Sequence, residues 1–138
     1  MRFVDTNIFL RFLVNDDSGK ADACEALFRK AIDGKEPLFT SDMVIAEIIW
    51  VLESYYELEK HDIREKVEKI LNTQHLSCTN REIIINALSL YVEKNIDYID
   101  AYNAFLLNVH KINEIYSYDK HYDRVDWLKR IEPGDESV

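Results

Sequence analysis

The amino-acid sequence predicts an α/β fold, in which helices cover the faces of a mainly parallel β-sheet. Short apolar runs that suit buried strands alternate along the chain with longer segments whose apolar residues recur every three or four positions, the spacing of amphipathic helices. Strands separated by helices in this way pair in parallel through right-handed crossovers. At 138 residues the chain has the length of one compact domain, which we expect over residues 1–132, with a frayed tail over residues 133–138.

The first half of the chain is predicted to contain two strands and three helices. Ser18 has the side chain of a helix N-cap, and Gly34 suits the end of the same helix. Thr40 and Ser41 offer caps for the helix that follows the second strand. The strands are residues 2–4 and 38–39, and the helices are residues 8–14, 18–33 and 40–56.

The second half repeats this alternation. Asp62 is predicted to begin a helix in which Ile63, Val67 and Ile70 form one apolar face. Asn80 is the predicted cap of the next helix. The helices are residues 62–71, 80–94 and 98–112, and the strands are residues 75–78 and 114–118.

Composition excludes several classes of protein. Hydrophobic residues make up 47% of the chain, while Gly and Pro are few, which excludes disordered and fibrous proteins. The sequence has neither a run of about 18 apolar residues nor the N-terminal pattern of a signal peptide, so we expect a cytoplasmic protein that does not bind membranes. Cys24 and Cys78 lie outside any C-x-x-C pattern, and we expect two buried thiols.

The charge distribution limits the ligands that the protein can bind. A net charge of −9 opposes a phosphate-coated partner, unless bound cations or a few local basic residues offset it. The histidines show no metal-ligand spacing, and we expect them to be structural or exposed. They are His61, His75, His110 and His121.

Four acidic residues occupy positions that are unusual for carboxylates. Asp5 and Asp119 each follow a predicted strand, at the end where open α/β sheets bind ligands. Glu47 lies in an otherwise apolar helix, where a buried carboxylate needs a cation or a basic partner. Asp100 follows Asp97 by three residues at the start of a helix. If these carboxylates converge, they repel one another unless cations bind them, and oxygen-rich clusters suit Mg²⁺ or Mn²⁺.

Each of these residues also has a simpler explanation that the sequence leaves open. Asp5 and Asp119 have the side chain of a turn or N-cap residue. Glu47 can lie on a narrow strip that faces solvent, or pair with a basic neighbour. Asp97 interacts favourably with a helix N-terminus, an explanation that fits Asp100 less well.

The same residues lie in four short motifs that resemble the PIN-domain family, and most of all the VapC-type toxins of bacterial and archaeal toxin–antitoxin pairs. A lone Asp-Thr-Asn is weak evidence, whereas four motifs in this order and spacing are strong evidence. The motifs span nearly the whole chain and are Phe3-Val4-Asp5-Thr6-Asn7-Ile8-Phe9-Leu10-Arg11, Ala46-Glu47-Ile48 with Trp50-Val51-Leu52, Asp97-Tyr98-Ile99-Asp100-Ala101, and Tyr116-Ser117-Tyr118-Asp119-Lys120.

The resemblance implies a three-layer α/β/α sandwich around a central, mainly parallel sheet of four or five strands. It also implies an endoribonuclease, the toxin of a toxin–antitoxin pair, in which metal-activated water cleaves RNA. Asp5, Glu47, Asp100 and Asp119 would be the catalytic residues and would bind one or two Mg²⁺ or Mn²⁺ ions. The products would carry 5′-phosphate and 3′-hydroxyl ends. A homodimer and a small antitoxin partner are implied as well.

Other residues near the motifs are expected to assist. The resemblance assigns a supporting role to five of them, which are Thr6, Asn7, Asp97, Ser117 and Asp123. Three basic residues are candidates for contacts with RNA phosphates, although surface cations are more often simply solvated. They are Arg11, Lys120 and Arg124.

Two other functions compete with this interpretation. One is a catalytically silent PIN-like module that binds RNA or protein, which the negative net charge mildly favours. The other is a receiver or phosphatase-type phosphotransfer domain, which also gathers aspartates at the ends of parallel strands. That chemistry needs an acceptor aspartate on a central strand, and His75-Leu76-Ser77-Cys78 supplies none.

Overall fold

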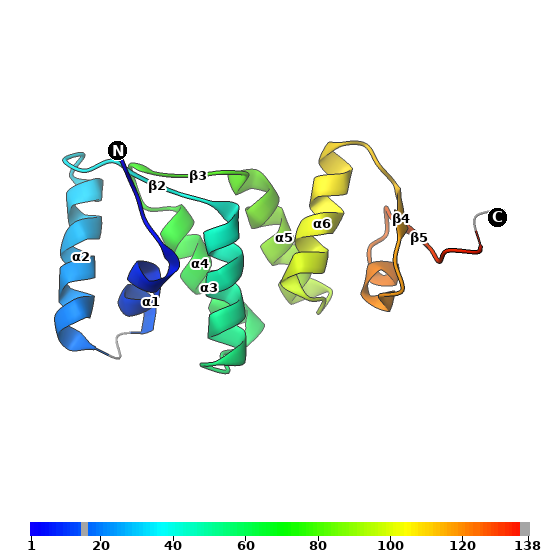
Figure 1. Ribbon diagram of the computed structural model, residues 1–138, viewed down its shortest axis with the longest axis horizontal. Coiled ribbons are helices and arrows are strands. Elements are labelled where there is room, and N and C mark those ends of the chain that lie inside the picture. The colour runs from blue at the N-terminus through cyan, green and yellow to red at the C-terminus, as the bar shows by residue number, and fades with distance from the viewer. Residues whose placement is uncertain (15–16, 136–138) are drawn as a thin grey trace. The chain divides into compact units, whose positions relative to one another are not determined.

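A computed structural model describes residues 1–14 and 17–135, and it confirms the α/β class. The chain divides into two compact units, Met1–Arg81 and Glu82–Val138 (Figure 1). Five strands occur in the described residues, and all of them pair in parallel. Three strands belong to the first unit and two to the second.

The first unit is a small parallel sheet with four helices. Its strands are β1 (Arg2–Phe3), β2 (Leu38–Thr40) and β3 (Leu76–Cys78), in the order β1-β2-β3. Its helices are α1 (Thr6–Val14), α2 (Ser18–Ile32), α3 (Asp42–Ser54) and α4 (Lys60–Leu71). Leu38 of β2 lies opposite both Arg2 and Leu76, so β2 is the central strand. The carboxyl ends of β1 and β2 therefore share one edge of the sheet.

The core of the first unit forms where the apolar faces of its helices meet. The rings of Phe9 on α1 and Phe28 on α2 stack with their centroids 5.4 Å apart. Ile48 and Leu52 on α3 and Ile63 on α4 are fully buried. Burying each such side chain stabilises the fold by about 1.5–3 kcal/mol, which is why short helices and strands hold together here.

The second unit contains two helices and a pair of strands. Its elements are α5 (Arg81–Glu93), whose first residue ends the first unit, α6 (Tyr98–Val109), β4 (Glu114–Tyr116), the 3₁₀ helix η1 (Lys120–Arg124) and β5 (Lys129–Ile131). Tyr91 on α5 packs edge to face against Tyr98 on α6, with ring centroids 6.1 Å apart. The indole of Trp127 packs on Phe105 and donates to the carbonyl oxygen of Ala104, which fastens the segment before β5 to α6.

Several predicted boundaries are corrected by the structure. Asp17, not Ser18, is the N-cap of α2, because the Asp17 side chain accepts the N–H of Lys20. The helix expected to begin at Asp62 begins at Lys60. Ser41 is confirmed as the N-cap of α3, since its side chain accepts the N–H of Val44.

Two elements of the C-terminal region, η1 and β5, are not among the elements predicted from the sequence. Both are short and have no clear apolar periodicity. The expected tail at residues 133–138 is described only as far as Asp135, and residues 136–138 lie outside the described residues. Among the helices that are described, none has the length and apolar character to cross a membrane.

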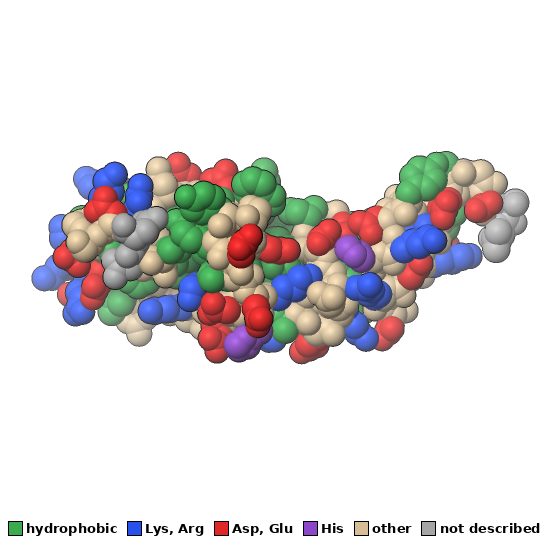
Figure 2. All heavy atoms as spheres, turned by 90° about the horizontal axis from the view of Figure 1, so that it is seen from below, with side chains coloured by type: hydrophobic (Ala, Val, Ile, Leu, Met, Phe, Trp, Pro, Cys, Tyr) green, Lys and Arg blue, Asp and Glu red, His purple; other side chains and the backbone are tan. Residues whose placement is uncertain are grey.

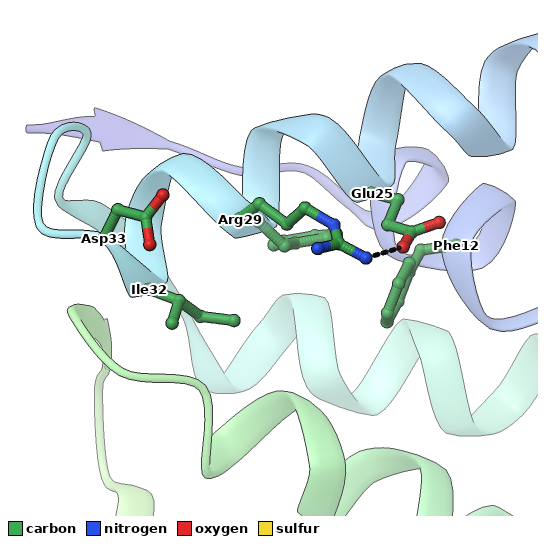
Figure 3. Close-up of a pocket in the computed structure, with 6 residues that line it drawn as sticks. Phe12, Glu25, Arg29, Ile32 and Asp33 are labelled. Carbon is green, nitrogen blue, oxygen red and sulfur yellow. Dashed lines mark hydrogen bonds and ion pairs between the residues drawn. The ribbon is translucent and has the colours of Figure 1, made fainter.

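A hollow of about 380 Å³ opens on the surface of the first unit beside α1 and α2. Phe12, Phe28 and Ile32 make its apolar lining, and the guanidinium of Arg29 pairs with Glu25 at 2.8 Å across its rim (Figure 3). The pairing satisfies both charges at the rim. The hollow holds none of the predicted site residues.

Candidate active site

Asp5 lies at the carboxyl end of β1, as predicted. The hydroxyl of the buried Thr40 donates to the carbonyl oxygen of Val4 at 3.0 Å and joins the carboxyl ends of β1 and β2. The next residue, Asp5, is exposed, and its Oδ1 accepts the backbone N–H of Thr6 at 2.8 Å. Asp5 thus supports the first turn of α1 through one of its two carboxylate oxygens.

Glu47 lies in the second turn of α3 and is exposed. The neighbours on its face of the helix, Met43 and Trp50, are 77% and 68% exposed. The apolar character of the helix around Glu47 therefore does not bury this face, although Ile45, Ile48 and Ile49 are buried on the other side. Within this unit, Glu47 fits the alternative of a solvent-facing strip.

The second unit brings together a compact group of ligand atoms, which we call the acidic cluster. It consists of Asp97, Asp100, Asp119 and His121, and one ligand atom from each residue lies within 4.8 Å of all the others. Asp97 and Asp100 come from the start of α6, whereas Asp119 and His121 come from the beginning of η1. Segments about 20 residues apart in the chain therefore meet here.

Local hydrogen bonds hold the Asp119 side of the cluster in place. The N–H of Asp119 donates to Oγ of Ser117 at 2.9 Å, and Asp119 Oδ1 accepts the N–H of His121 at 2.9 Å. Asp119 is therefore the N-cap of η1, which fits the simpler explanation for this residue. The same Oδ1 also lies 3.5 Å from Nδ1 of His121, so the capping oxygen is part of the cluster.

The two sides of the cluster differ in acidity. The Asp100 side chain is 14% exposed, and this burial raises the pKa of its carboxyl, with a further increase from the neighbouring Asp119. The pKa of Asp119 is lowered, first by the backbone N–H of His121 that donates to it and then by its hydrogen bond with Asp100. A proton shared between the two carboxyls is therefore held on Asp100.

Tyr122 is the buried neighbour of Asp100 in the cluster. Its ring is buried, its hydroxyl accepts a hydrogen bond from Nδ2 of Asn103 at 3.0 Å, and burial raises its pKa. A hydrogen bond between Tyr122 and Asp100 opposes the increase in the pKa of Asp100. The Asp100 side chain is therefore less exposed to solvent than those of Asp97 and Asp119.

The predicted supporting residues fall into different settings. Thr6 is buried at the start of α1, and Asn7 lines a hollow of about 310 Å³ together with Arg11 and Tyr55. Asp97 is the exposed N-cap of α6 but makes no side-chain cap bond, so its carboxylate faces the cluster instead.

Asp123 takes a structural role in the second unit. Its carboxylate pairs with Arg130 of β5 at 2.9 Å. Ser117, another predicted supporting residue, accepts the N–H of Asp119 through its hydroxyl and a guanidinium N–H of Arg130 through its carbonyl oxygen. Both residues therefore support the loop that carries Asp119.

The predicted phosphate contacts also differ from one another. Arg124 donates to the carbonyl oxygens of Lys94 and Asn95, at 3.3 and 2.5 Å, and so ties η1 to the turn before α6. Lys120 is exposed next to Asp119. Basic and acidic side chains are interspersed over the face in Figure 2, with no broad basic patch in that view. On this face, a contact with a polyanion would therefore depend on single cations rather than on a general positive field.

One member of the cluster, His121, was expected to be structural or exposed. No local spacing indicated this role, because the side chains of a 3₁₀ helix align at i and i+3 and not two residues apart. The structure therefore unites Asp97, Asp100 and Asp119 and adds His121. Asp5 and Glu47 belong to the first unit, and their convergence with Asp100 and Asp119 stays a prediction.

The cluster suits a divalent cation by the chemistry of its donors. Three carboxylates and one imidazole supply hard oxygen ligands and one nitrogen ligand, and the carboxylates repel one another unless a positive charge lies between them. The raised pKa of Asp100 records part of that repulsion. The residues present therefore fit the metal that the resemblance implies.

Two comparisons with known proteins identify a relative and a family of this chain. A curated VapC ribonuclease from Aquifex aeolicus (strain VF5) is 28% identical to the chain over 137 residues, which cover 99% of the chain and 100% of that protein. The sequence profile of the PIN domain matches residues 2–128, a range that includes every residue of the acidic cluster as well as Asp5 and Glu47. The chain belongs to the PIN-domain family.

Proposed function

We propose that this protein is a divalent-metal-dependent endoribonuclease and the toxin of a toxin–antitoxin pair. The observation that carries the proposal is the acidic cluster, in which Asp97, Asp100 and Asp119 approach one another at the start of two helices. The full-length similarity to a VapC ribonuclease supports RNA as the substrate.

Four carboxylates would hold the metal, namely Asp5, Glu47, Asp100 and Asp119. When bound, Mg²⁺ or Mn²⁺ supplies Lewis-acid stabilisation of the phosphodiester and lowers the pKa of water. Asp119, with its lowered pKa, stays ionised and holds positive charge at the site. Asp100 has a raised pKa in the metal-free site and would bind the cation as the ionised carboxylate, with release of its proton.

Other residues would bind and orient the RNA. Lys120 is exposed beside Asp119, and Arg11 lines a hollow with Asn7, so both are candidates for phosphate contacts. Arg124 already donates to two backbone carbonyl oxygens, so its contribution would be to hold η1 in place as well as to supply charge. Thr6, Asp97, Ser117 and Asp123 would support the site.

The proposal includes two protein partners, a second copy of the chain and a small antitoxin, in the cytoplasm. Large apolar side chains that are exposed in the first unit support such contacts, among them Met43, Trp50 and Tyr55. Light scattering of the purified protein tests the homodimer, for which we expect twice the mass of the 16.3 kDa chain. A mass of one chain at micromolar concentration would remove the homodimer from the proposal.

Cleavage of labelled RNA tests the proposed activity. We expect cutting with Mg²⁺ or Mn²⁺, and none with EDTA. Asp5→Asn and Asp100→Asn should each lower the rate by at least about 100-fold, the scale on which active-site electrostatics acts. Asp126→Asn, which removes an exposed carboxylate of the second unit outside the cluster, is the matched control and should cut normally. Cutting that survives EDTA would contradict the proposal.

The same assay separates a catalytically silent module from a nuclease. The net charge of −9 is the observation that favours such a module. RNA that is bound and released intact in the presence of either metal would identify a binding protein. The products of a nuclease should carry 5′-phosphate ends, which a phosphatase followed by relabelling detects.

A further inference from the structure

His121 occupies the centre of the acidic cluster. Its Nδ1 lies 3.4 Å from Asp100 Oδ2, 3.5 Å from Asp119 Oδ1 and 3.7 Å from Asp97 Oδ2. The three distances are nearly equal, although the three aspartates come from two different segments of the chain. A histidine that merely paired with one carboxylate would lie closer to that one than to the other two.

These distances match the spacing of donor atoms around a single cation. Ligand atoms at about 2.1 Å from an octahedral ion are about 3.0 Å apart when adjacent and about 4.2 Å apart when opposite. The separations of 3.4 to 3.7 Å fall inside this range. A cation between the imidazole and the carboxylates therefore needs only small side-chain adjustments.

Local structure on both sides of His121 positions its imidazole. The backbone N–H of His121 donates to the carboxylate of Asp119 at 2.9 Å, so both donors belong to one turn. The next residue, Tyr122, is buried and fixes the following turn of η1. The His121 side chain is itself 34% exposed, which leaves room for a cation with water ligands on its open side.

We propose that Nδ1 of His121 is a direct ligand of the divalent cation. The inference rests on the proposed function, because it concerns the same site. It adds a nitrogen donor to a set of carboxylate oxygens. Imidazole is a poor ligand for Mg²⁺ and a better one for first-row transition metals, so the site prefers Mn²⁺ to Mg²⁺.

Pulsed electron paramagnetic resonance of the Mn²⁺-loaded protein tests the inference. The sample is the full chain without an affinity tag, at pH 7.5, and Mn²⁺ is the only metal added. We expect modulation from a directly bound nitrogen, which changes when the protein is made with ¹⁵N-histidine. His121→Asn should abolish it, whereas His61→Asn, which alters an exposed histidine of α4, should leave it unchanged.

Calorimetry of the same variants tests the metal preference. His121→Asn should weaken Mn²⁺ binding by about tenfold or more, and Mg²⁺ binding by less than about threefold. Equal losses for both metals would show that His121 acts only by orienting the carboxylates and would overturn the inference.

Failure of the inference and failure of the proposed function give different results. Mn²⁺ that binds to the wild-type protein without nitrogen coupling overturns the His121 ligand alone, and this result requires no variant. Mn²⁺ that does not bind, or that binds Asp100→Asn as tightly as the wild type, overturns both.

Discussion

At the scale of single residues, two carboxylates of the acidic cluster differ in pKa because their surroundings differ. Asp100 packs against Tyr122 and has a raised pKa, whereas Asp119 accepts a backbone N–H and has a lowered pKa. Both aspartates belong to the acidic cluster. The difference comes from burial and from one hydrogen bond, and it determines which carboxyl binds a proton first.

Replacing Asp100 should stabilise the metal-free protein. Because the pKa of Asp100 is raised, ionisation opposes folding, and the stabilisation present at low pH is lost as the pH rises through that pKa. Asp100→Asn stays neutral, so at pH 7.5 in EDTA it should gain about 0.5–2 kcal/mol in urea unfolding. The gain should shrink as the pH falls toward the ordinary aspartate range of about 3.9.

Asp119→Asn is the contrasting variant and should show no gain. The pKa of Asp119 is lowered, so its contribution to stability is present at neutral pH and is lost as the pH falls through the folded-state value. If both variants stabilised the protein equally, the assignment of the proton to Asp100 would be wrong.

At the scale of secondary structure, β5 supports the turn that carries Asp119. Arg130 of β5 is 12% exposed in its side chain and pairs with both Asp123 and Glu132. It also donates to the carbonyl oxygen of Ser117, whose hydroxyl accepts the N–H of Asp119. The guanidinium of Arg130 thus connects β5 to the turn that carries Asp119.

Arg130→Met should weaken metal binding without removing a ligand. The variant keeps the apolar stem but loses the contacts that hold the Ser117 to Asp123 turn, and partners of this kind are typically worth about tenfold or more in metal affinity. Calorimetry with Mn²⁺ measures the change. Lys129→Met, on the exposed neighbour in β5, is the matched control, and a loss of the same size there would remove Arg130 from this role.

In the first unit, one hydroxyl joins β1 and β2 at the edge where Asp5 lies. Thr40→Val keeps the shape of the side chain but leaves the buried carbonyl oxygen of Val4 without this donor, so it should cost about 1–3 kcal/mol in urea unfolding. Thr73→Val removes only a local bond to Lys69 at the end of α4 and should cost less. Equal losses of unfolding free energy in the two variants would show that the hydrogen bond between the strands stabilises the fold no more than a local one.

At the scale of the whole molecule, the excess of acidic residues and the metal are linked. The chain carries a net charge of −9, and a divalent cation that binds only the folded protein offsets part of it. At a concentration of about 100 times its Kd, the cation should stabilise the fold by about 2.7 kcal/mol. A rise in Tm of about 5–10 °C should follow for a chain of this size.

Differential scanning fluorimetry measures that rise with Mn²⁺ and with Mg²⁺. Asp100→Asn should lose most of it, and Asp126→Asn should keep it. An equal rise in the two variants would indicate that the cation binds the surface generally rather than the acidic cluster.

Much of this protein could be read from local signals in its sequence. Caps and apolar periodicity act within a few residues, so the helices, four of the five described strands and the aspartates at their ends were predicted, and Ser41 was placed correctly as a cap. The spacing of Asp97 and Asp100 also places both at the start of one helix, although the side-chain cap that it suggested for Asp97 is not made. The family resemblance also needed only residue order.

Only the tertiary structure decided which side chains meet. His121 joins Asp97, Asp100 and Asp119 because the chain brings η1 back to the start of α6. The residues in this contact are about 20 positions apart in the sequence, and no local pattern encodes it. For the same reason, Asp123 and Arg124 prove to hold loops together, and Glu47 proves to be exposed. Burial and proximity are properties of the folded path, and they determine what each charged group can do.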